Sequence, residues 1–379
     1  MTEPLCIAID LRPLLDPNES GVQVYVRSIV KRLLQDRSID WLLFYQARKP
    51  CPRIHTLFPQ VLHLPHSNSK FHLAAALHFS KLPKKYFPKT PDLLWMPDRR
   101  PFYRCPFPVV MTVHDRIPEK DRSSLSLKSR LWHRLFPLKR LLKLSDGLLF
   151  PSLTVAQSLA FKGPKEVTYE GVEPFVKPKR PQSLSSAITA KNFYLALSPA
   201  DPRKRLEWIA RAAARFPKMN FVVAGLKPKD SRFKKLELTR HKNLHFLSFV
   251  NEEEKTWLYK NAKALLALSR AEGFDLPVLE AVRAKCPVLL SNIPVHHELY
   301  KNAEWIQTEE DLWKALYLGQ KGKLKIPTPR GNYNWDFAAQ RTLLFFLRVL
   351  RHEDGKRGRH WHSHDHAHDT QSFEPNEHR

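Results

Sequence analysis

The chain has 379 residues, a formal net charge of +26 at pH 7 and 42% apolar residues. The apolar fraction excludes wholesale disorder, and the length is sufficient for two domains with separate cores. The charge predicts anionic partners or surroundings without identifying them. Nucleic acid, a lipid surface and a diphosphate-bearing substrate would all be attracted.

The cysteines and the amino terminus indicate a reducing compartment. Cys6, Cys51, Cys105 and Cys286 show no CxxC spacing, so the sequence suggests neither a disulfide framework nor a zinc site. The first residues lack a basic region followed by a long apolar run, and about 18 uninterrupted apolar residues occur nowhere. We therefore expect a cytoplasmic protein without a membrane span.

The first half of the chain alternates short apolar runs with helical patterns. A helix is expected where apolar residues recur at helical spacing between Val22 and Leu33. Strands are expected at residues 5–9, 41–45, 93–95, 109–113 and 148–150. This alternation predicts a parallel sheet. Residues 165–190 break the pattern with Pro174, Pro178 and Pro181, and are expected to link two domains.

A second alternating series follows that linker. Strands are expected at residues 193–197, 221–225, 244–247 and 264–267, and helices at 206–214, after the cap residue Asn251, and at 337–350. The predicted fold class is α/β, with two doubly wound units. The expected domains are residues 1–175, residues 176–335, a crossover helix at 336–351 and a His-rich tail at 352–379.

The most informative segment runs from Ser269 to Ala281, where two glutamates flank a glycine-containing turn and an apolar helix. Glu272 is expected in the loop and Glu280 one turn into the helix that begins at Pro277. The loop follows a strand, at the sheet edge where open α/β folds bind ligands. Carboxylates there accept hydrogen bonds from sugar or ribose hydroxyls. The alternative is two ordinary surface glutamates.

Four further residues carry chemistry suited to a phosphorylated sugar ligand. Arg203 and Lys204 precede a predicted helix, so two cations and a helix N-terminus would point at the same phosphates. His114 ends a strand and could bond a sugar hydroxyl. Gly21 would let a ligand approach the backbone closely. Each has a simpler alternative, because a loop can carry a basic pair and a strand-end histidine can be structural.

Five motifs in this order resemble the retaining glycosyltransferases of family 4, also called glycosyl transferases group 1, which have the GT-B fold. The group includes bacterial mannosyl- and glucosyltransferases. The similarity covers roughly residues 5–350. The motifs contain Asp10 with Gly21 and Tyr25, Thr112 to Asp115, Pro202 to Lys204, Glu272 to Glu280, and Asn292 with Glu298.

The resemblance implies two Rossmann-like domains facing a central cleft, with a last helix that crosses back onto the first domain. It also implies transfer of a hexose, mannose or glucose, from a nucleotide-diphosphate sugar to a glycan or lipid-linked acceptor of the cell envelope. No cofactor or catalytic metal is expected. The reaction would proceed by same-face attack guided by the leaving phosphate, without a covalent nucleophile.

The resemblance also assigns roles to individual residues. Glu280 should hold the donor ribose, Glu272 the sugar hydroxyls, and Gly21 the loop over the diphosphate. The expected catalytic residues are His114, Glu272, Arg203 and Lys204. The expected donor-binding residues are Gly21, Arg203, Lys204, Glu272, Gly273, Phe274, Asp275, Leu276 and Glu280.

Departures from the family pattern at three places predict reduced or unusual donor use. Asp275 replaces a second glycine, and an ionised carboxylate near a diphosphate weakens binding unless it turns away. Lys285 replaces a helix-ending glycine, and residues 197–199 replace a glycine-rich strand end. One alternative is therefore a descendant that binds nucleotide or glycan without turnover. Another is a nucleic-acid-binding protein, supported by charge alone, since no recognisable nucleic-acid module occurs.

The segment from Ser123 to Leu144 combines apolar and basic residues in a helical pattern. Leu131 and Leu135 share its apolar face with Leu138 and Leu142. It is either a membrane-surface helix or a core helix with a basic exterior, which Pro137 would kink. We expect peripheral association with anionic lipid through the amino-terminal domain. Other basic clusters lie at residues 81–89, 128–143 and 227–235.

The carboxyl-terminal tail has five histidines at alternate positions. They are His360, His362, His364, His366 and His368. Neutral imidazoles at this spacing could chelate Zn²⁺ or Ni²⁺, although such a tract is more often a solvated tail. We expect weak metal binding unrelated to catalysis.

Overall fold

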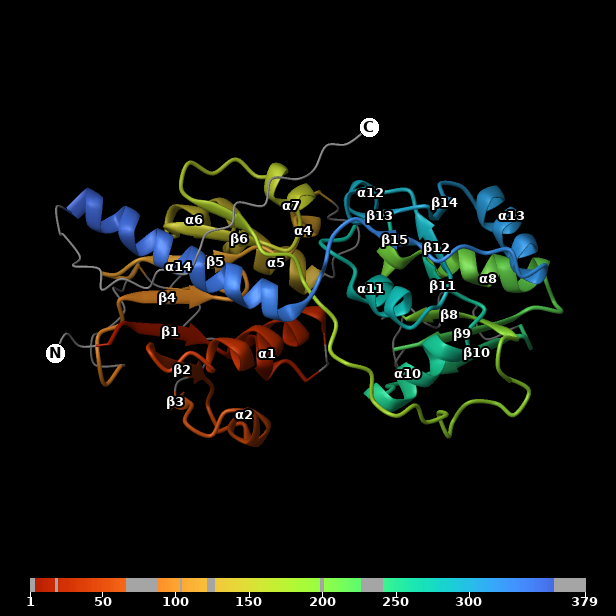
Figure 1. Cartoon of the computed structure of the whole chain (residues 1–379), viewed down its shortest axis with the longest axis horizontal. Coiled ribbons are helices and arrows are strands. Elements are labelled where there is room, and N and C mark those ends of the chain that lie inside the picture. The colour runs from red at the N-terminus through yellow and green to blue at the C-terminus, as the bar shows by residue number, and fades with distance from the viewer. Residues whose placement is uncertain are drawn as a thin grey trace.

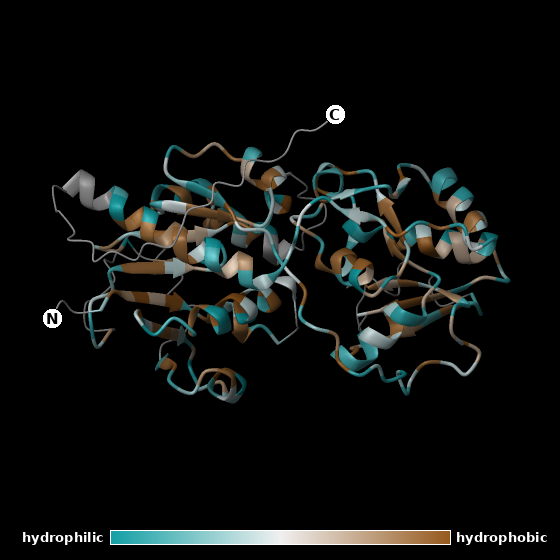
Figure 2. Cartoon of the chain, in the orientation of Figure 1, coloured by the Kyte–Doolittle hydropathy of each residue, from teal (hydrophilic) through white to brown (hydrophobic). Residues whose placement is uncertain are grey.

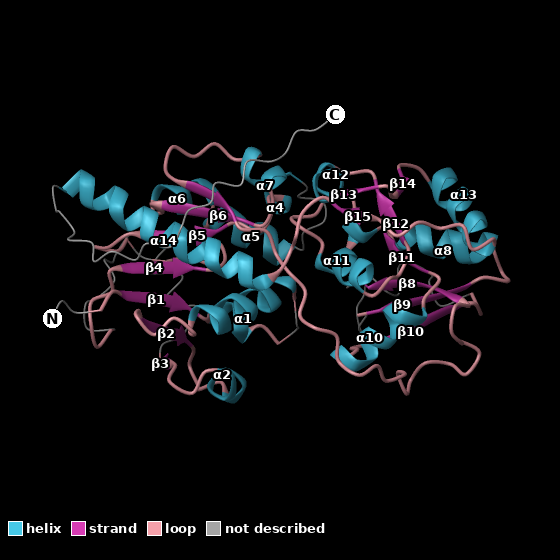
Figure 3. Ribbon diagram, in the orientation of Figure 1, coloured by secondary structure: helices cyan, strands magenta, loops and turns pink. Residues whose placement is uncertain are grey.

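The computed structural model describes residues 4–17, 20–65, 87–102, 104–120, 127–197, 201–225 and 241–357. They form two α/β units, each built on a parallel sheet with helices around it (Figure 1, Figure 3). The expected fold class is confirmed. Figure 2 shows the central strands of both sheets as hydrophobic, because helices cover both of their faces.

The first sheet has seven strands in the order β3-β2-β1-β4-β5-β6-β7. Every strand pairing described in it is parallel. The strands are β1 (Cys6–Asp10), β2 (Asp40–Gln46), β3 (Leu62–Leu64), β4 (Leu93–Met96), β5 (Val109–Thr112), β6 (Gly147–Phe150) and β7 (Lys165–Val167). The strand order reverses beside β1, which is the position where ligands enter such sheets.

Short helices connect these strands. They are η1 (Arg12–Leu15), α1 (Gly21–Leu33), α2 (Pro52–Leu57), α4 (Ile117–Lys120), α5 (Leu127–Leu135), α6 (Leu138–Lys143) and α7 (Leu153–Gln157). Helix α1 begins after Ser20, whose side chain accepts a hydrogen bond from the Gln23 amide. Of the helical segment expected over residues 123–144, residues 123–126 lie outside the described residues, and the remainder forms two helices instead of one kinked helix. Pro137 caps α6 and separates it from α5, because proline has no amide hydrogen to continue a helix.

The second sheet has six strands in the order β10-β9-β8-β11-β12-β14. They are β8 (Phe193–Leu197), β9 (Asn220–Ala224), β10 (Leu244–Leu247), β11 (Ala264–Ala267), β12 (Val288–Ser291) and β14 (Glu304–Ile306). A small antiparallel pair joins β13 (Tyr300–Lys301) to β15 (Thr328–Pro329). The predicted strands at residues 193–197, 244–247 and 264–267 are confirmed at the same residues.

The helices of the second unit are η4 (Pro202–Lys204), α8 (Leu206–Arg215), α10 (Glu252–Asn261), α11 (Leu276–Arg283), α12 (Pro294–Leu299) and α13 (Glu309–Gln320). The cap predicted at Asn251 is confirmed. Its side chain accepts from the Glu254 amide, and the Glu254 carboxylate accepts from the Asn251 amide.

The expected linker over residues 165–190 is wrong at its start. Lys165–Val167 forms β7 and pairs with β6 at the edge of the first sheet. The remainder, from Thr168 onward, contains no regular element and carries the chain to the second unit (Figure 1).

Helix α14 (Trp335–Arg357) returns to the first domain (Figure 1). It packs on α1, and its Phe345 and Val349 fill the space beside Gly147 in β6. Arg341 and Arg348 pair with Glu166 in β7. The last helix therefore braces the first sheet, as the family resemblance implies.

The two chain crossings between the domains lie side by side. Gly171, in the outward crossing, lies so close to the return crossing that a Cβ atom there would overlap the Trp335 amide nitrogen. Arg32 in α1 binds both segments, with its guanidinium 2.9 Å from Glu173 and 2.6 Å from Asp336. Arg32 thus links both crossings to the first domain.

Candidate functional site between the domains

Predicted motifs from both domains meet in the structure. The turn before α11 packs on the end of β5, so closely that a Cβ atom at Gly273 would overlap the His114 carbonyl oxygen. The Ser152 hydroxyl donates to the Gly273 carbonyl at 2.7 Å. A Cβ atom at Gly21 would lie 3.8 Å from the Leu276 side chain. Residues chosen from the sequence for a donor site therefore lie at one interdomain junction.

A cluster of charged side chains lies on the second-domain side of this junction. The Lys204 ammonium is 2.8 Å from Glu272 and 3.5 Å from Asp275. Arg203 lies 2.8 Å from Asp201 and 3.7 Å from Glu272. Burial alone would lower the pKa of Lys204, but the carboxylates of Asp275 and Glu272 raise it, so the ammonium stays charged.

The sequence suggested that Arg203 and Lys204 point at phosphates. In the structure, both side chains are instead paired with carboxylates. Asp201, Glu272 and Asp275 already balance the two cations. Sequence reasoning missed Asp201, although an aspartate just before Pro202 is a recognisable helix cap. Its side chain accepts from the Arg203 amide and fixes η4.

Asp275 occupies a left-handed backbone conformation, with φ of 73°. Glycine adopts this region without strain, which accounts for the glycine of the family pattern. The Asp275 carboxylate turns inward, is 2% exposed, and lies 3.1 Å from Nε2 of the buried His296. Burial would raise its pKa, but Lys204 and His296 lower it to about 2. The carboxylate is thus held by Lys204 and His296, beside the pocket that Asp275 helps to line.

His296 is a second member that sequence reasoning missed. Its ring is fully buried, and its other nitrogen, Nδ1, lies 2.9 Å from the Ser291 carbonyl oxygen. Nothing in the local pattern marks it, because it joins Asp275 across 21 positions.

Glu280 and Phe274 lie outside the Lys204 cluster. The Glu280 carboxylate accepts hydrogen bonds from Lys255 at 2.8 Å and Tyr259 at 2.7 Å, both on α10. Phe274 is buried and packs edge-on against Tyr333, with ring centroids 5.7 Å apart. Phe274 therefore contributes to packing, while Glu280 is bound to α10 through both of its carboxylate oxygens.

A pocket opens at the carboxyl ends of β8 and β11, beside Lys204 and Asp275. Its lining comes from Ala196, Leu197, Lys204, residues 265–269, Asp275 and Pro277. The Ser269 hydroxyl is fully buried and has no hydrogen-bond partner among the described residues. This is the sheet edge at which the sequence predicted ligand binding.

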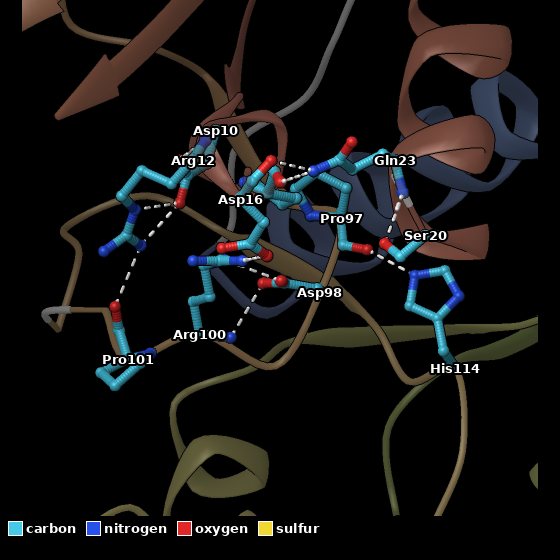
Figure 4. A network of polar contacts seen from close by, with 11 residues as sticks. Asp10, Arg12, Asp16, Ser20, Gln23, Pro97, Asp98, Arg100, Pro101 and His114 are labelled. Atoms are coloured by element: carbon cyan, nitrogen blue, oxygen red, sulfur yellow. Dashed lines mark hydrogen bonds and ion pairs between the residues drawn. The ribbon is translucent and has the colours of Figure 1, made fainter. Parts of the chain in front are cut away.

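His114 faces the junction from the first domain. Its Nε2 lies 2.8 Å from the Pro97 carbonyl oxygen (Figure 4). Its ring packs edge-on against Tyr25, with ring centroids 4.8 Å apart. Its Nδ1 lies 3.8 Å from the buried carboxylate of Glu170. Burial would lower the pKa of His114, but Glu170, the Pro97 carbonyl and Asp98 together raise it. Sequence reasoning did not single out Glu170.

A polar network holds the loop that precedes α1 (Figure 4). Arg12 and Asp10 form a buried ion pair at 2.6 Å. Arg100 lies 2.5 Å from Asp16 and 2.8 Å from Asp98. Gln23, in the first turn of α1, donates to the Asp16 carbonyl at 2.7 Å. The loop is thus fixed from both sides before Gly21.

Glu298 clamps the second domain to the first. Its carboxylate accepts from the backbone amides of Leu153 and Thr154 at 2.6 and 2.7 Å, and from the Thr154 hydroxyl at 2.6 Å. It therefore caps α7 across the domain boundary. Asn292, paired with Glu298 in the sequence motif, instead bonds His297.

Some predictions concern parts of the chain that the structure does not describe. The histidines at 360–368, the lysines at 81–85 and the basic residues at 227–235 lie outside the described residues. Within the described ranges, no group of three or more His, Cys, Asp or Glu side chains is arranged to hold a metal ion. Within the same ranges, no helix is long and apolar enough to cross a membrane.

The comparison with protein families decides the nature of the second unit. The family described as Glycosyl transferases group 1 matches over residues 175–316. This segment is a glycosyl transferases group 1 domain. The domain contains the Lys204 cluster, the pocket and Glu280, so the site lies where the family match is found.

Curated relatives match parts of the chain, and they include mannosyltransferases. The serotype-specific mannosyltransferase WbdA of Escherichia coli is 29% identical over 163 residues, which is 37% of this chain and 19% of WbdA. The O-antigen chain mannosyltransferase RfbU of Salmonella typhimurium is 27% identical over 205 residues, which is 53% of this chain and 57% of RfbU. The chain thus spans about a fifth of WbdA and just over half of RfbU.

Solved structures share the fold over nearly the whole chain. Sucrose-phosphate synthase from Thermosynechococcus elongatus has a TM-score of 0.60 at 16% identity, covering 93% of this chain and 98% of that one. WaaG, a glycosyltransferase involved in lipopolysaccharide biosynthesis, has a TM-score of 0.59 at 17% identity, covering 92% and 98%. The group 1 domain therefore sits in a two-domain GT-B fold.

Proposed function

We propose that this protein is a retaining glycosyltransferase of family 4. It transfers a hexose from a nucleotide-diphosphate sugar to a glycan or lipid-linked acceptor in cell-envelope polysaccharide or glycolipid synthesis. The observation that carries the proposal is the meeting of Lys204 and Glu272 with His114 at one interdomain junction, through Gly273. The group 1 domain and the O-antigen mannosyltransferase relatives support it, and of the two expected hexoses, mannose and glucose, the relatives favour mannose.

The cluster of Arg203, Lys204 and Glu272 suggests how a nucleotide-diphosphate sugar would bind. A bound diphosphate would compete with Glu272 for Lys204, now 2.8 Å away. Lys204 and Arg203 would then stabilise the negative charge that develops on the leaving phosphate. The released Glu272 carboxylate would accept hydrogen bonds from sugar hydroxyls. Donor binding thus exchanges an internal ion pair for ligand contacts.

The remaining roles follow the same arrangement. Glu280, held by Lys255 and Tyr259, would bind the ribose, because a carboxylate fixed by two donors retains acceptor capacity for hydroxyls. His114 would contact the transferring sugar from the first domain. Attack on the same face as the departing phosphate needs no enzyme nucleophile, and the cations at 203 and 204 replace a divalent metal.

The test is calorimetric titration of the full chain with UDP-, GDP- and ADP-hexoses. Selective binding of one donor is expected, and it is expected to vanish in Glu280→Ala and in the double variant Arg203→Ala, Lys204→Ala. Excess EDTA is expected to leave binding and transfer unchanged, and the product should keep the donor's anomeric configuration by NMR. Binding without transfer would favour a silent GT-B protein. Absence of all donor binding would refute the proposal.

We also propose peripheral association of the first domain with anionic membrane at the cytoplasmic face. On α5, Leu131 and Leu135 are 59% and 52% exposed, next to the exposed Arg134. On α6 the apolar residues Leu138 and Leu141 are instead buried. Exposed leucines beside basic residues are suited to the headgroup region of an anionic bilayer.

Sedimentation with vesicles tests this association. Binding to phosphatidylserine-containing vesicles at low salt is expected, with a loss in the double variant Leu131→Ser, Leu135→Ser. The exposed Leu344 on α14 supplies the control variant Leu344→Ser, which should bind as the wild type does. Equal recovery of all three proteins with neutral vesicles, or no recovery with anionic ones, would rule it out.

A further inference from the structure

Glu170 is a buried carboxylate that the proposed reaction has not used. It follows β7, is 5% exposed, and lies next to Gly171 at the point where the chain leaves the first domain. The residue that faces its carboxylate is His114, with Oε1 and Nδ1 3.8 Å apart. A buried carboxylate is unfavourable unless a charge or a proton compensates it. His114 is therefore the group that can supply the compensating charge or proton to Glu170.

The hydrogen bond between His114 and Pro97 fixes which ring nitrogen faces Glu170. Nε2 lies 2.8 Å from the Pro97 carbonyl oxygen, which can only accept, so Nε2 carries a hydrogen. The nitrogen facing Glu170 is then Nδ1. Between Nδ1 and the Glu170 carboxyl group there is room for one proton, carried either by the imidazole or by the acid.

The groups around His114 and Glu170 favour keeping that proton on one of these two side chains. Burial raises the pKa of Glu170, and Glu170 with the Pro97 carbonyl raises the pKa of His114 against the effect of its burial. Asp98, next to Pro97, adds negative potential. The Tyr25 ring covers the His114 edge, and burial raises the pKa of Tyr25 to about 12, so its hydroxyl stays neutral.

We propose that Glu170 is a positioning residue that sets the protonation and the ring orientation of His114. It orients Nδ1, while the Pro97 carbonyl orients Nε2, so the imidazole is held from both sides beside the Gly273 turn. Its relevance to sugar transfer rests on the proposed function, because only there does His114 contact the donor. The pair itself is a property of the fold and can be tested without any substrate.

The test follows the imidazole resonances of the ¹⁵N-histidine-labelled full chain through a pH titration. Glu170→Gln keeps the side-chain shape and removes the charge. It is expected to move the His114 titration midpoint to lower pH. Glu166→Gln, on the same segment but paired with Arg341 and Arg348, is the matched control and should leave the midpoint where it is. His114→Ala identifies the resonance.

A second variant and a measurement of sugar transfer complete the test. If Glu170→Gln is not folded by circular dichroism, Glu170→Asp, which keeps the charge on a shorter side chain, should shift the midpoint less than removal of the charge would. An unchanged midpoint in folded Glu170→Gln would overturn the proposal. If the wild type binds no donor, the proposed function fails, yet the titration still decides the pair. If it transfers sugar, Glu170→Gln should alter the pH profile of kcat and leave nucleotide affinity unchanged.

Discussion

At the scale of single residues, Asp275 links backbone conformation to charge. Its left-handed φ would suit glycine, and an aspartate there is stabilised by inward contacts with His296 and Lys204. Aspartate is among the few residues that tolerate this region. The residue therefore keeps the shape of the turn that the resemblance implies and changes the charge around Lys204.

Replacement of Asp275 by glycine tests what that charge does. Removal of a carboxylate 3.5 Å from the Lys204 ammonium should strengthen nucleotide-diphosphate affinity by about tenfold, since one less negative charge faces the phosphates. Titration calorimetry measures the change. Glu309→Gln, which removes a surface charge paired with Arg211, is the control and should have no effect. If Asp275→Gly binds and turns over donor as the wild type does, Asp275 is not the cause of unusual donor use.

The His114 and Glu170 pair predicts a dependence of stability on pH. Both folded-state pKa values are raised, so the folded protein binds more protons than the unfolded chain above the ordinary pKa of glutamate. The stabilising contribution is therefore full at low pH and is lost as pH rises through the folded pKa of His114. Thermal unfolding from pH 5 to 8 should show a shallower loss in Glu170→Gln than in the wild type. Parallel curves for the two proteins would contradict this.

The site shows which residues a sequence can reveal. Lys204, Glu272 and Gly273 follow strands or precede helices in short motifs, so their chemistry and place could be inferred together. Glu170 and His296 could not, because each is paired by a tertiary contact with a residue far away in the sequence, His114 and Asp275 respectively. Local spacing carries no information on such pairs.

At the scale of helices and strands, burial explains part of what could be predicted, although the buried strand β12 was missed as well. The central strands β1, β5 and β11 are buried along their length, so their apolar runs were visible in the sequence. The edge strands β3 and β7 are short and only half-buried, and they were missed. The break between α5 and α6 shows the opposite case, in which one residue, Pro137, outweighs a continuous helical pattern.

Helix α7 depends on a cap from the other domain, and Glu298→Ala tests it. Loss of the carboxylate leaves two α7 amides and the Thr154 hydroxyl without their acceptor, which should destabilise the protein by about 2 kcal/mol. Denaturant unfolding measures this. Glu310→Ala, in the exposed first turn of α13, is the control and should change stability little. Equal stability of the two variants would show that Glu298 does not hold the domains together.

At the scale of the whole molecule, the domains are joined at two places that differ in kind. Near Arg32 the two chain crossings lie against each other, and α14 fixes the return crossing to the first sheet. Near the site, the domains meet at the Gly273 turn, at the contact of Gly21 with Leu276 and at the Glu298 cap, where α7 packs on α12. The first junction is covalent and braced, whereas the second consists of non-covalent contacts. Any opening of the cleft would therefore pivot about the crossings.

Gly171→Ala tests the close approach of the crossings. A methyl group there would overlap the Trp335 backbone, so one of the two crossings has to move. The expected loss of stability is about 1–3 kcal/mol, the range for overpacking a tight interior. Small-angle scattering should also show a changed separation of the domains, because both connections pass this point.

Gly21→Ala is the matched control for that substitution. A Cβ atom at Gly21 would meet only the Leu276 side chain at 3.8 Å, an ordinary contact, and alanine favours the helix that begins there. Its stability and scattering curve should therefore match those of the wild type. If Gly171→Ala also matched the wild type, the crossings could separate freely and α14 alone would set the domain arrangement. If both variants lost stability, the loss would reflect glycine replacement in general and not the contact between the crossings.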